Sequence, residues 1–262
     1  MSQRKASAGW GWIKGGFGML RKQPGELSTM LMGYMCALLV FSLIPLIGPL
    51  LPAILMPMLS VAFMRAGAHI ELGKRAMPSL LLSGFRQPVV KPLVALGFVN
   101  LVVMGLAIAI FLMVNDGTYV KVVTGELARD ADEVRDSNFG MSLLSALLFY
   151  VPFGMALLFA PALVYWQKMS VGKAIFYSFF AVVRSLKAFL VFVLCWFAIL
   201  IVPAQLVALL FGRSSFAVIL MVPLSLILTV VLQCSFYASY REIFGLPENE
   251  ADAEKPPLPP AE

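Results

Sequence analysis

Five long stretches of this chain contain no charged residue, and this feature constrains its fold more than any other. They run from Leu27 to Met64, Pro92 to Asn115, Met141 to Trp166, Ala188 to Gly212 and Ser214 to Tyr240. A helix needs roughly 20 apolar residues to cross the hydrocarbon core of a bilayer. Backbone polar groups inside that core must be paired within the protein, so such spans form helices. The stretches therefore predict an all-α, polytopic integral membrane protein.

The first stretch is too long for one helix. The prolines and glycine of "IPLIGPLLP" interrupt it near its middle, which predicts a tight helical hairpin. We expect six spans in a single membrane domain over residues 1–241, at about 27–44, 49–68, 93–114, 141–165, 188–211 and 215–240. Residues 242–262 are acidic and rich in proline, which predicts a disordered cytoplasmic tail.

Composition and charge agree with a membrane protein. Apolar residues make up 60% of the chain and charged residues 13%, and the formal net charge is +6. The cations lie between apolar runs and form no basic tract, so membrane topology explains the charge better than nucleic-acid binding does. Residues 1–22, 65–91 and 168–187 carry most of the Lys and Arg, and positive residues favour the cytoplasmic side. We therefore expect both termini in the cytoplasm and an uncleaved first span.

A short amphipathic segment precedes each pair of spans, which predicts a unit used three times. Residues 170–187 form the clearest case: stepping about 100° per residue places Lys173, Arg184 and Lys187 on one face and apolar side chains on the other. In the second segment Leu81, Phe85 and Val89 oppose Ser79, Ser83 and Arg86, and in the first Trp12, Ile13, Phe17 and Leu20 oppose Lys14 and Arg21.

Such helices lie along the membrane interface with their cations near anionic phospholipid headgroups. The predicted contacts with lipid or with a protein partner are Lys14, Arg21, Arg86, Lys173, Arg184 and Lys187. Glycines weaken the first segment as a helix.

Uncharged polar residues and prolines inside the spans are the next candidates. Asn100, Gln205 and Gln233 could line a substrate path, although hydrogen bonds between helices are the commoner use of buried amides. Pro161 and Ser178 are candidate hinge positions. The uncharged stretches offer no ionisable Asp, Glu, Lys, Arg or His at depth, which argues against ion-coupled transport.

Metal binding and catalysis have no recognisable residues in the sequence. His69 lacks further metal ligands at a workable spacing, and the three cysteines lie inside apolar runs without a CxxC spacing. The acidic loop around residues 130–136 lacks the glycine and glutamate of a calcium loop. We expect no catalytic residue, no metal and no cofactor, and thus a protein that is not an enzyme.

The stretch "FAPALVYWQKMSVGKAIFYSFFAVVRSLKAFLVF" resembles a signature of uncharacterised six-helix bacterial inner-membrane proteins. Pro161, Gly172, Ala174 and Ser178 occupy the matching positions. A similar pattern occurs in the membrane domain fused to some glycerophosphodiester phosphodiesterases, whose catalytic domain this sequence lacks. The resemblance covers nearly the whole chain, especially toward short betaproteobacterial members, and it implies a multi-pass location in the inner membrane.

Two hypotheses for function follow. In the first, basic interfacial helices bind anionic lipid or hold a protein partner at the cytoplasmic face. In the second, the protein transports a solute or handles lipid along a polar pathway between the repeats.

Overall fold

The computed structural model describes residues 6–45, 48, 50–85, 88–115, 117–125, 138–212 and 214–247. Its elements are α1 (Ala8–Lys22), α2 (Pro24–Ser42), α3 (Leu51–Glu71), the 3₁₀ helix η1 (Pro78–Phe85), α4 (Val90–Val114), α5 (Thr118–Thr124), α7 (Phe139–Leu158), α8 (Ala160–Gln167), α9 (Val171–Arg184), α10 (Leu186–Phe211) and α11 (Ser215–Phe244). These residues form no strand. The predicted all-α class is confirmed.

Six helices of this part of the chain are long and apolar enough to cross a membrane, counting α7 and α8 as one span. Several of them extend past the uncharged stretches: α3 continues through Arg65 to Glu71, α11 continues to Phe244, and α4 and α10 begin before Lys91 and Lys187. Long charged side chains can reach the interface from a helix end, so a charge near the end of a span does not terminate the helix. The predicted tail, 242–262, lies outside the described residues beyond position 247.

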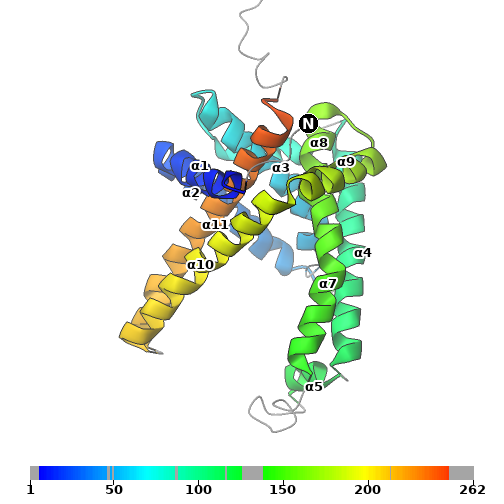
Figure 1. Ribbon diagram of the computed structural model, residues 1–262, viewed down its shortest axis with the longest axis vertical. Coiled ribbons are helices and arrows are strands. Elements are labelled where there is room, and N and C mark those ends of the chain that lie inside the picture. The colour runs from blue at the N-terminus through cyan, green and yellow to red at the C-terminus, as the bar shows by residue number, and fades with distance from the viewer. Residues whose placement is uncertain are drawn as a thin grey trace, which may run out of the picture.

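Helix α3 lies at the centre of the molecule and is the most buried of the six candidate spans. It contacts α4, η1, α11 and α8. Figure 1 shows α4 and α7 side by side on one flank and α10 and α11 side by side on the other, and the two pairs diverge away from the end that carries α8 and α9. Much of the outward surface of both pairs consists of large apolar side chains, as expected for contact with lipid.

Helix α1 packs along α10 and α11. From the sequence we expected the glycines of α1 only to weaken the helix, but two of them also allow it to pack closely on its neighbours. A Cβ on Gly9 would lie 2.7 Å from the backbone nitrogen of Phe192, and one on Gly16 would lie 2.6 Å from the carbonyl oxygen of Val231. Hydrogen in place of a side chain therefore allows close approach of the helices, as it does generally between membrane helices.

The second amphipathic segment is a 3₁₀ helix, and its predicted faces hold only in part: Ser79 is exposed and Val89 is buried as expected. Ser83, which we placed on the polar face, is buried, and Phe85, which we placed on the apolar face, is 39% exposed. A 3₁₀ helix has about three residues per turn, which aligns residues i and i+3 instead of i and i+4. Leu80 and Ser83 accordingly share the buried side. The first and third amphipathic segments are α-helices and the second is a 3₁₀ helix, and the threefold repeat stays a prediction.

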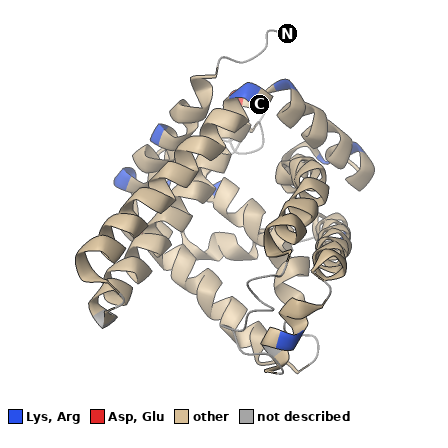
Figure 2. Ribbon diagram, turned by 60° about the horizontal axis from the view of Figure 1, so that its bottom comes forward, with Lys and Arg blue, Asp and Glu red and all other residues tan. Residues whose placement is uncertain are grey.

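Lys and Arg lie mainly at one end of the molecule, where α1, α3, α8, α9 and α11 meet (Figure 2). Within the described residues the opposite end carries Lys121 in α5. This asymmetry is the structural counterpart of the charge pattern read from the sequence.

Candidate functional site

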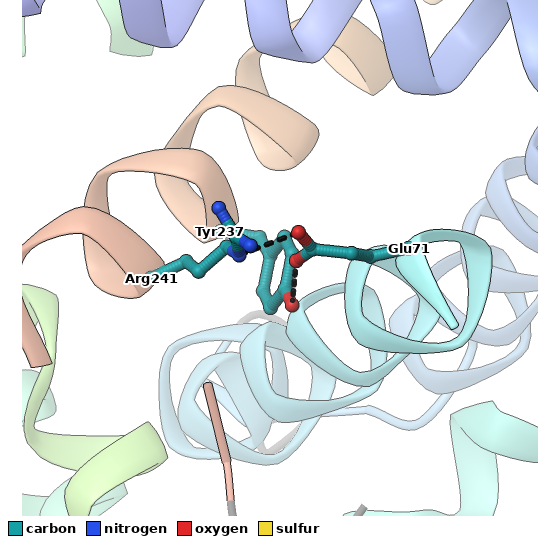
Figure 3. A network of polar contacts seen from close by, with 3 residues as sticks. All are labelled: Glu71, Tyr237 and Arg241. Carbon is teal, nitrogen blue, oxygen red and sulfur yellow. Dashed lines mark hydrogen bonds and ion pairs between the residues drawn. The ribbon is translucent and has the colours of Figure 1, made fainter. Parts of the chain in front are cut away.

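A polar network ties the end of α3 to the end of α11. The hydroxyl of Tyr237 donates a hydrogen bond to Glu71 Oε2 at 2.7 Å, and Arg241 Nε lies 2.5 Å from Glu71 Oε1. Figure 3 shows the tyrosine and the arginine approaching the same carboxylate from α11. The Glu71 side chain is 24% exposed and that of Arg241 51%, so the network lies at the border of the packed interior.

A second contact joins the same end of α11 to α1. Trp12 Nε1 donates to Glu242 Oε2 at 2.6 Å. The Trp12 ring is buried against Phe189 and Phe192 of α10, with ring centroids 4.8 and 6.1 Å away. Helix α11 is thus held at its end by α3 on one side and by α1 on the other.

Two cations lie over the ring of Tyr165 on α8. The Arg65 guanidinium carbon is 5.4 Å from the ring centroid and Lys168 Nζ is 5.2 Å from it, both within cation–π range. The neighbouring Trp166 is buried and packs on Tyr240 with a centroid distance of 4.8 Å. Aromatic packing therefore joins α8 to α11 at this end.

The fourth predicted span is broken into α7 and α8, and Ser178 of α9 fills the break. The Phe159 N–H donates to Ser178 Oγ at 3.0 Å, and that hydroxyl donates to the Met155 carbonyl at 2.9 Å. In an unbroken helix the N–H of residue 159 would bond directly to the carbonyl of residue 155. The hydroxyl has inserted into the helical hydrogen-bond ladder, a known cause of kinks, just before Pro161. The structure thus brings both predicted hinge positions, Pro161 and Ser178, to one bend.

Helix α9 exposes its cations together with aromatic rings. Lys173 and Arg184 on α9, and Lys187 just beyond it, are exposed. Between them Phe176 and Phe180 are exposed by 59% and 41%. This mixture of cations and large apolar rings is typical of a helix that lies in the membrane interface.

The buried edge of α9 overlaps the expected apolar face only in part. Ala174 and Ser178 are buried against the neighbouring helices although they lie outside that face. Val182 belongs to the expected face and is buried, and Val183 belongs to it but is 40% exposed. Small residues allow α9 to approach α7 and α8 closely. Of the other residues of the predicted face, Val171, Ile175 and Phe179 are half-buried and Leu186 is exposed.

A groove of about 410 Å³ lies between α7 and α9. All the residues that line it are apolar: Pro152, Phe153, Ala156, Gly172, Ile175, Phe176 and Phe179. A second open groove of about 470 Å³ lies along the first turns of α11, from Gly212 to Ser225. Neither groove is lined by Asn100, Gln205 or Gln233.

Asn100 makes a contact between helices. Its Nδ2 donates to the Ala53 carbonyl at 2.9 Å. Pro57 lies inside α3, four residues after Ala53, and has no N–H to offer that carbonyl. Asn100 therefore supplies from α4 the hydrogen bond that α3 cannot make within itself.

The other predicted residues do not gather at one place. Gln205 is exposed on α10 and Gln233 is half-buried on α11. Lys14 and Arg21 are exposed on α1, and Arg86 lies outside the described residues. The described part of the chain has no group of three or more His, Cys, Asp or Glu side chains placed to hold a metal ion.

Glu71, Tyr237 and Arg241 are missing from the sequence-based candidates. Tyr237 lies within an uncharged stretch, Arg241 follows directly after the same stretch, and Glu71 lies seven positions past the end of another, where charges mark loops in most membrane proteins. The tyrosine and the glutamate that bond to each other are 166 positions apart in the chain. A polar residue one helical turn inside the end of a span is the signal that could have pointed to the network.

Six apolar helices with cations gathered at one end define a multi-pass membrane protein. The chain is 35% identical over 251 residues to a protein of Burkholderia thailandensis named "probable inner membrane protein", and the match covers 93% of each chain. The chain belongs to the family of that inner-membrane protein. No protein-family model matches the chain, and no solved structure matches it at a significant level.

Proposed function

We propose that this inner-membrane protein binds anionic phospholipid headgroups at the cytoplasmic face through α9 and that it is not an enzyme. The observation that carries the proposal is the exposure of Lys173 and Arg184 beside exposed aromatic rings on the interfacial helix α9, with Lys187 exposed in the first turn of α10 directly after it. Apolar rings enter the acyl boundary, while lysine and arginine side chains extend toward phosphate groups. The bend at Ser178 holds this helix against the membrane-spanning α7.

The orientation belongs to the same proposal. The end of the molecule that carries α8 and α9 also carries most of the Lys and Arg of the described residues (Figure 2). Positive residues favour the cytoplasmic side, so this end faces the cytoplasm and both termini are cytoplasmic. Anionic lipids make the surface potential of that leaflet negative, which attracts the cations of α9.

The transport hypothesis has less support. It needs a polar path near Asn100, Gln205 and Gln233, yet Asn100 bonds to the backbone of α3 and Gln205 is exposed on α10. Both grooves described above are open, and the one between α7 and α9 is wholly apolar.

The first hypothesis also has a second form, in which a protein partner instead of lipid docks on the exposed cations of α9. The likeness to the membrane domain of some glycerophosphodiester phosphodiesterases stays a prediction, and no phosphodiesterase activity is proposed.

The test replaces Lys173, Arg184 and Lys187 together with Gln in the full chain. One cation near an anionic membrane contributes about 1 kcal/mol, which is roughly a fivefold change in a binding constant. Wild type and variant are reconstituted with phosphatidylglycerol and phosphatidylcholine, and the lipids that stay bound after mild extraction are counted by native mass spectrometry. We expect the enrichment of phosphatidylglycerol to fall by about fivefold or more.

Lys121→Gln is the matched control, because it removes a cation from the opposite end of the molecule. It should leave the enrichment unchanged. An equal enrichment in the wild type and in the triple variant would reject headgroup binding by α9.

A further inference from the structure

We infer that the groove between α7 and α9 holds an acyl chain of an anionic phospholipid whose phosphate group is bound by Lys173. The inference rests on the proposed function and deepens it, since it assigns a defined lipid site to the interfacial helix. Its first support is the chemistry of the groove walls. Phe153 and Pro152 on α7 face Phe176 and Phe179 on α9, and no lining residue offers a polar side chain.

The size and the place of the groove suit a hydrocarbon chain. Its volume of about 410 Å³ is within the range of roughly 300–1,000 Å³ that is common for ligand sites. One wall belongs to a candidate membrane span and the other to the helix that carries the interfacial cations. An apolar groove between a candidate span and an interfacial helix is open to lipid tails. Its apolar walls favour contact with hydrocarbon over contact with water.

Charge complementarity selects an anionic lipid. Lys173 follows Gly172, a residue of the groove, and precedes Phe176, another groove residue, by three positions. Residues three apart are neighbours on a helix surface, so the lysine lies beside the groove on the same helix. Its side chain is exposed, and Nζ lies 5.8 Å from the centroid of the Tyr177 ring, which does not line the groove. The flexible lysine side chain therefore turns toward Phe176 when it binds a phosphate beside the groove. A phosphate bound there leaves the attached acyl chain next to the apolar walls.

Gly172 keeps part of the groove open. A Cβ built on it has no other atom within 4 Å, and its φ is not in the left-handed region. Neither a close helix contact nor the backbone conformation therefore requires glycine at this position. A larger side chain at position 172 would occupy the space next to Phe176 without displacing protein atoms.

The experiment replaces Gly172 with Leu in the full-length protein. The leucine should fill the groove and lower the number of phospholipids retained after mild detergent extraction by about fivefold, since it displaces several buried methylene groups. Gly105→Leu is the matched control, because Gly105 is also an exposed helical glycine with nothing within 4 Å of a Cβ. The control lies on α4, away from the groove residues, and should retain lipid as the wild type does.

A labelling experiment on the unmodified chain is independent of any folding defect in the variants. The protein is reconstituted with phosphatidylglycerol that carries a diazirine in one acyl chain, and the cross-linked peptides are mapped after illumination. We expect labelling concentrated on residues 152–156 and 175–179, and lost in Gly172→Leu. Labelling spread evenly over the exposed faces of α4, α7, α10 and α11 would overturn the acyl-chain site.

The two proposals fail in different ways. If Gly172→Leu retains lipid and labels as the wild type does, while the triple Gln variant loses phosphatidylglycerol, the groove is rejected and headgroup binding by α9 stands. If the triple Gln variant also keeps its enrichment, both proposals are rejected. If Lys173→Gln alone leaves the labelling of the groove by the anionic lipid unchanged, the assignment of the phosphate to Lys173 is wrong.

Discussion

At the scale of single residues, one hydroxyl group connects the two parts of a broken span. Ser178 is fully buried, and its Oγ bonds to the Phe159 N–H and to the Met155 carbonyl. The inserted hydroxyl separates the Phe159 N–H from the Met155 carbonyl, and Pro161, at the start of α8, has no N–H to offer the Leu157 carbonyl. In lipid such groups are costly to leave unpaired, so a side chain that reaches them fixes the bend.

Replacing Ser178 with Ala should therefore destabilise the protein. The substitution leaves a buried N–H and a buried carbonyl without the hydroxyl, and loss of such partners costs about 1–3 kcal/mol. The free energy of unfolding in mild detergent, measured by titration with a denaturing detergent, should fall by that amount. Ser225→Ala is the control, since Ser225 is exposed and bonds only to the Val222 carbonyl within its own helix. Equal losses in the two variants would show that the hydroxyl of Ser178 has no special role.

The residues at this bend could be predicted from the sequence, but the hydrogen bonds that fix it could not. Pro161 and Ser178 were both candidate hinge positions, because proline interrupts a helix and because both match the family signature. The insertion of the hydroxyl between residues 155 and 159 depends on how α9 packs on α7, which no local pattern encodes. The hydrogen bond from Tyr237 to Glu71 is harder still to predict, since the two residues are 166 positions apart in the chain.

At the scale of elements, glycines set how closely helices approach. Gly97 of α4 faces α3, and a Cβ on it would lie 2.8 Å from the carbonyl carbon of Ile54. The neighbouring Asn100 donates to Ala53 at the same crossing. Membrane helices gain stability from close packing of this kind, because lipid tails supply no hydrophobic driving force between them.

Gly97→Ala should separate α3 from α4 at this crossing. Backbone atoms of Ile54 cannot move aside as a flexible side chain can, so we expect a loss of about 1–3 kcal/mol from overpacking. Gly105→Ala on the same helix meets open space and should be neutral or stabilising by up to about 1 kcal/mol. Denaturing-detergent titrations of the two variants measure the difference, and a Gly97→Ala protein as stable as Gly105→Ala would contradict the close crossing.

The positions of the spans could be predicted from the sequence, but the packed face of α9 could not. The spans were predictable because the absence of charge over a bilayer thickness is a local property of the sequence. The face of α9 that packs on protein was not, because a period of 3.6 residues cannot distinguish an apolar side that meets lipid from one that meets a helix. Ala174 and Ser178 are buried because their small side chains allow the neighbouring helices to approach closely, and not because they are hydrophobic.

At the scale of the whole molecule, the distribution of cations gives the protein two unlike ends. Helix α9, which carries Lys173 and Arg184, lies at the same end as α8, whose Tyr165 contacts Arg65, and α5, which carries Lys121, lies at the other end (Figure 1). Positive residues resist transfer across the inner membrane during insertion. The end that carries α9 should therefore remain in the cytoplasm together with both termini.

Cysteine labelling tests this orientation. Cys36, Cys195 and Cys234 are replaced with Ala, and single cysteines are introduced as Ser7→Cys before α1, Val120→Cys on α5 and Leu246→Cys after α11, all at exposed positions. A maleimide that cannot cross the inner membrane should label position 120 in intact spheroplasts, and positions 7 and 246 only after permeabilisation. The reverse pattern would place α9 on the periplasmic side of the inner membrane and reject headgroup binding at the cytoplasmic leaflet. Labelling of all three positions in intact spheroplasts would mean that the chain inserts in both orientations, in which case the excess of cations at one end is too weak to fix its topology.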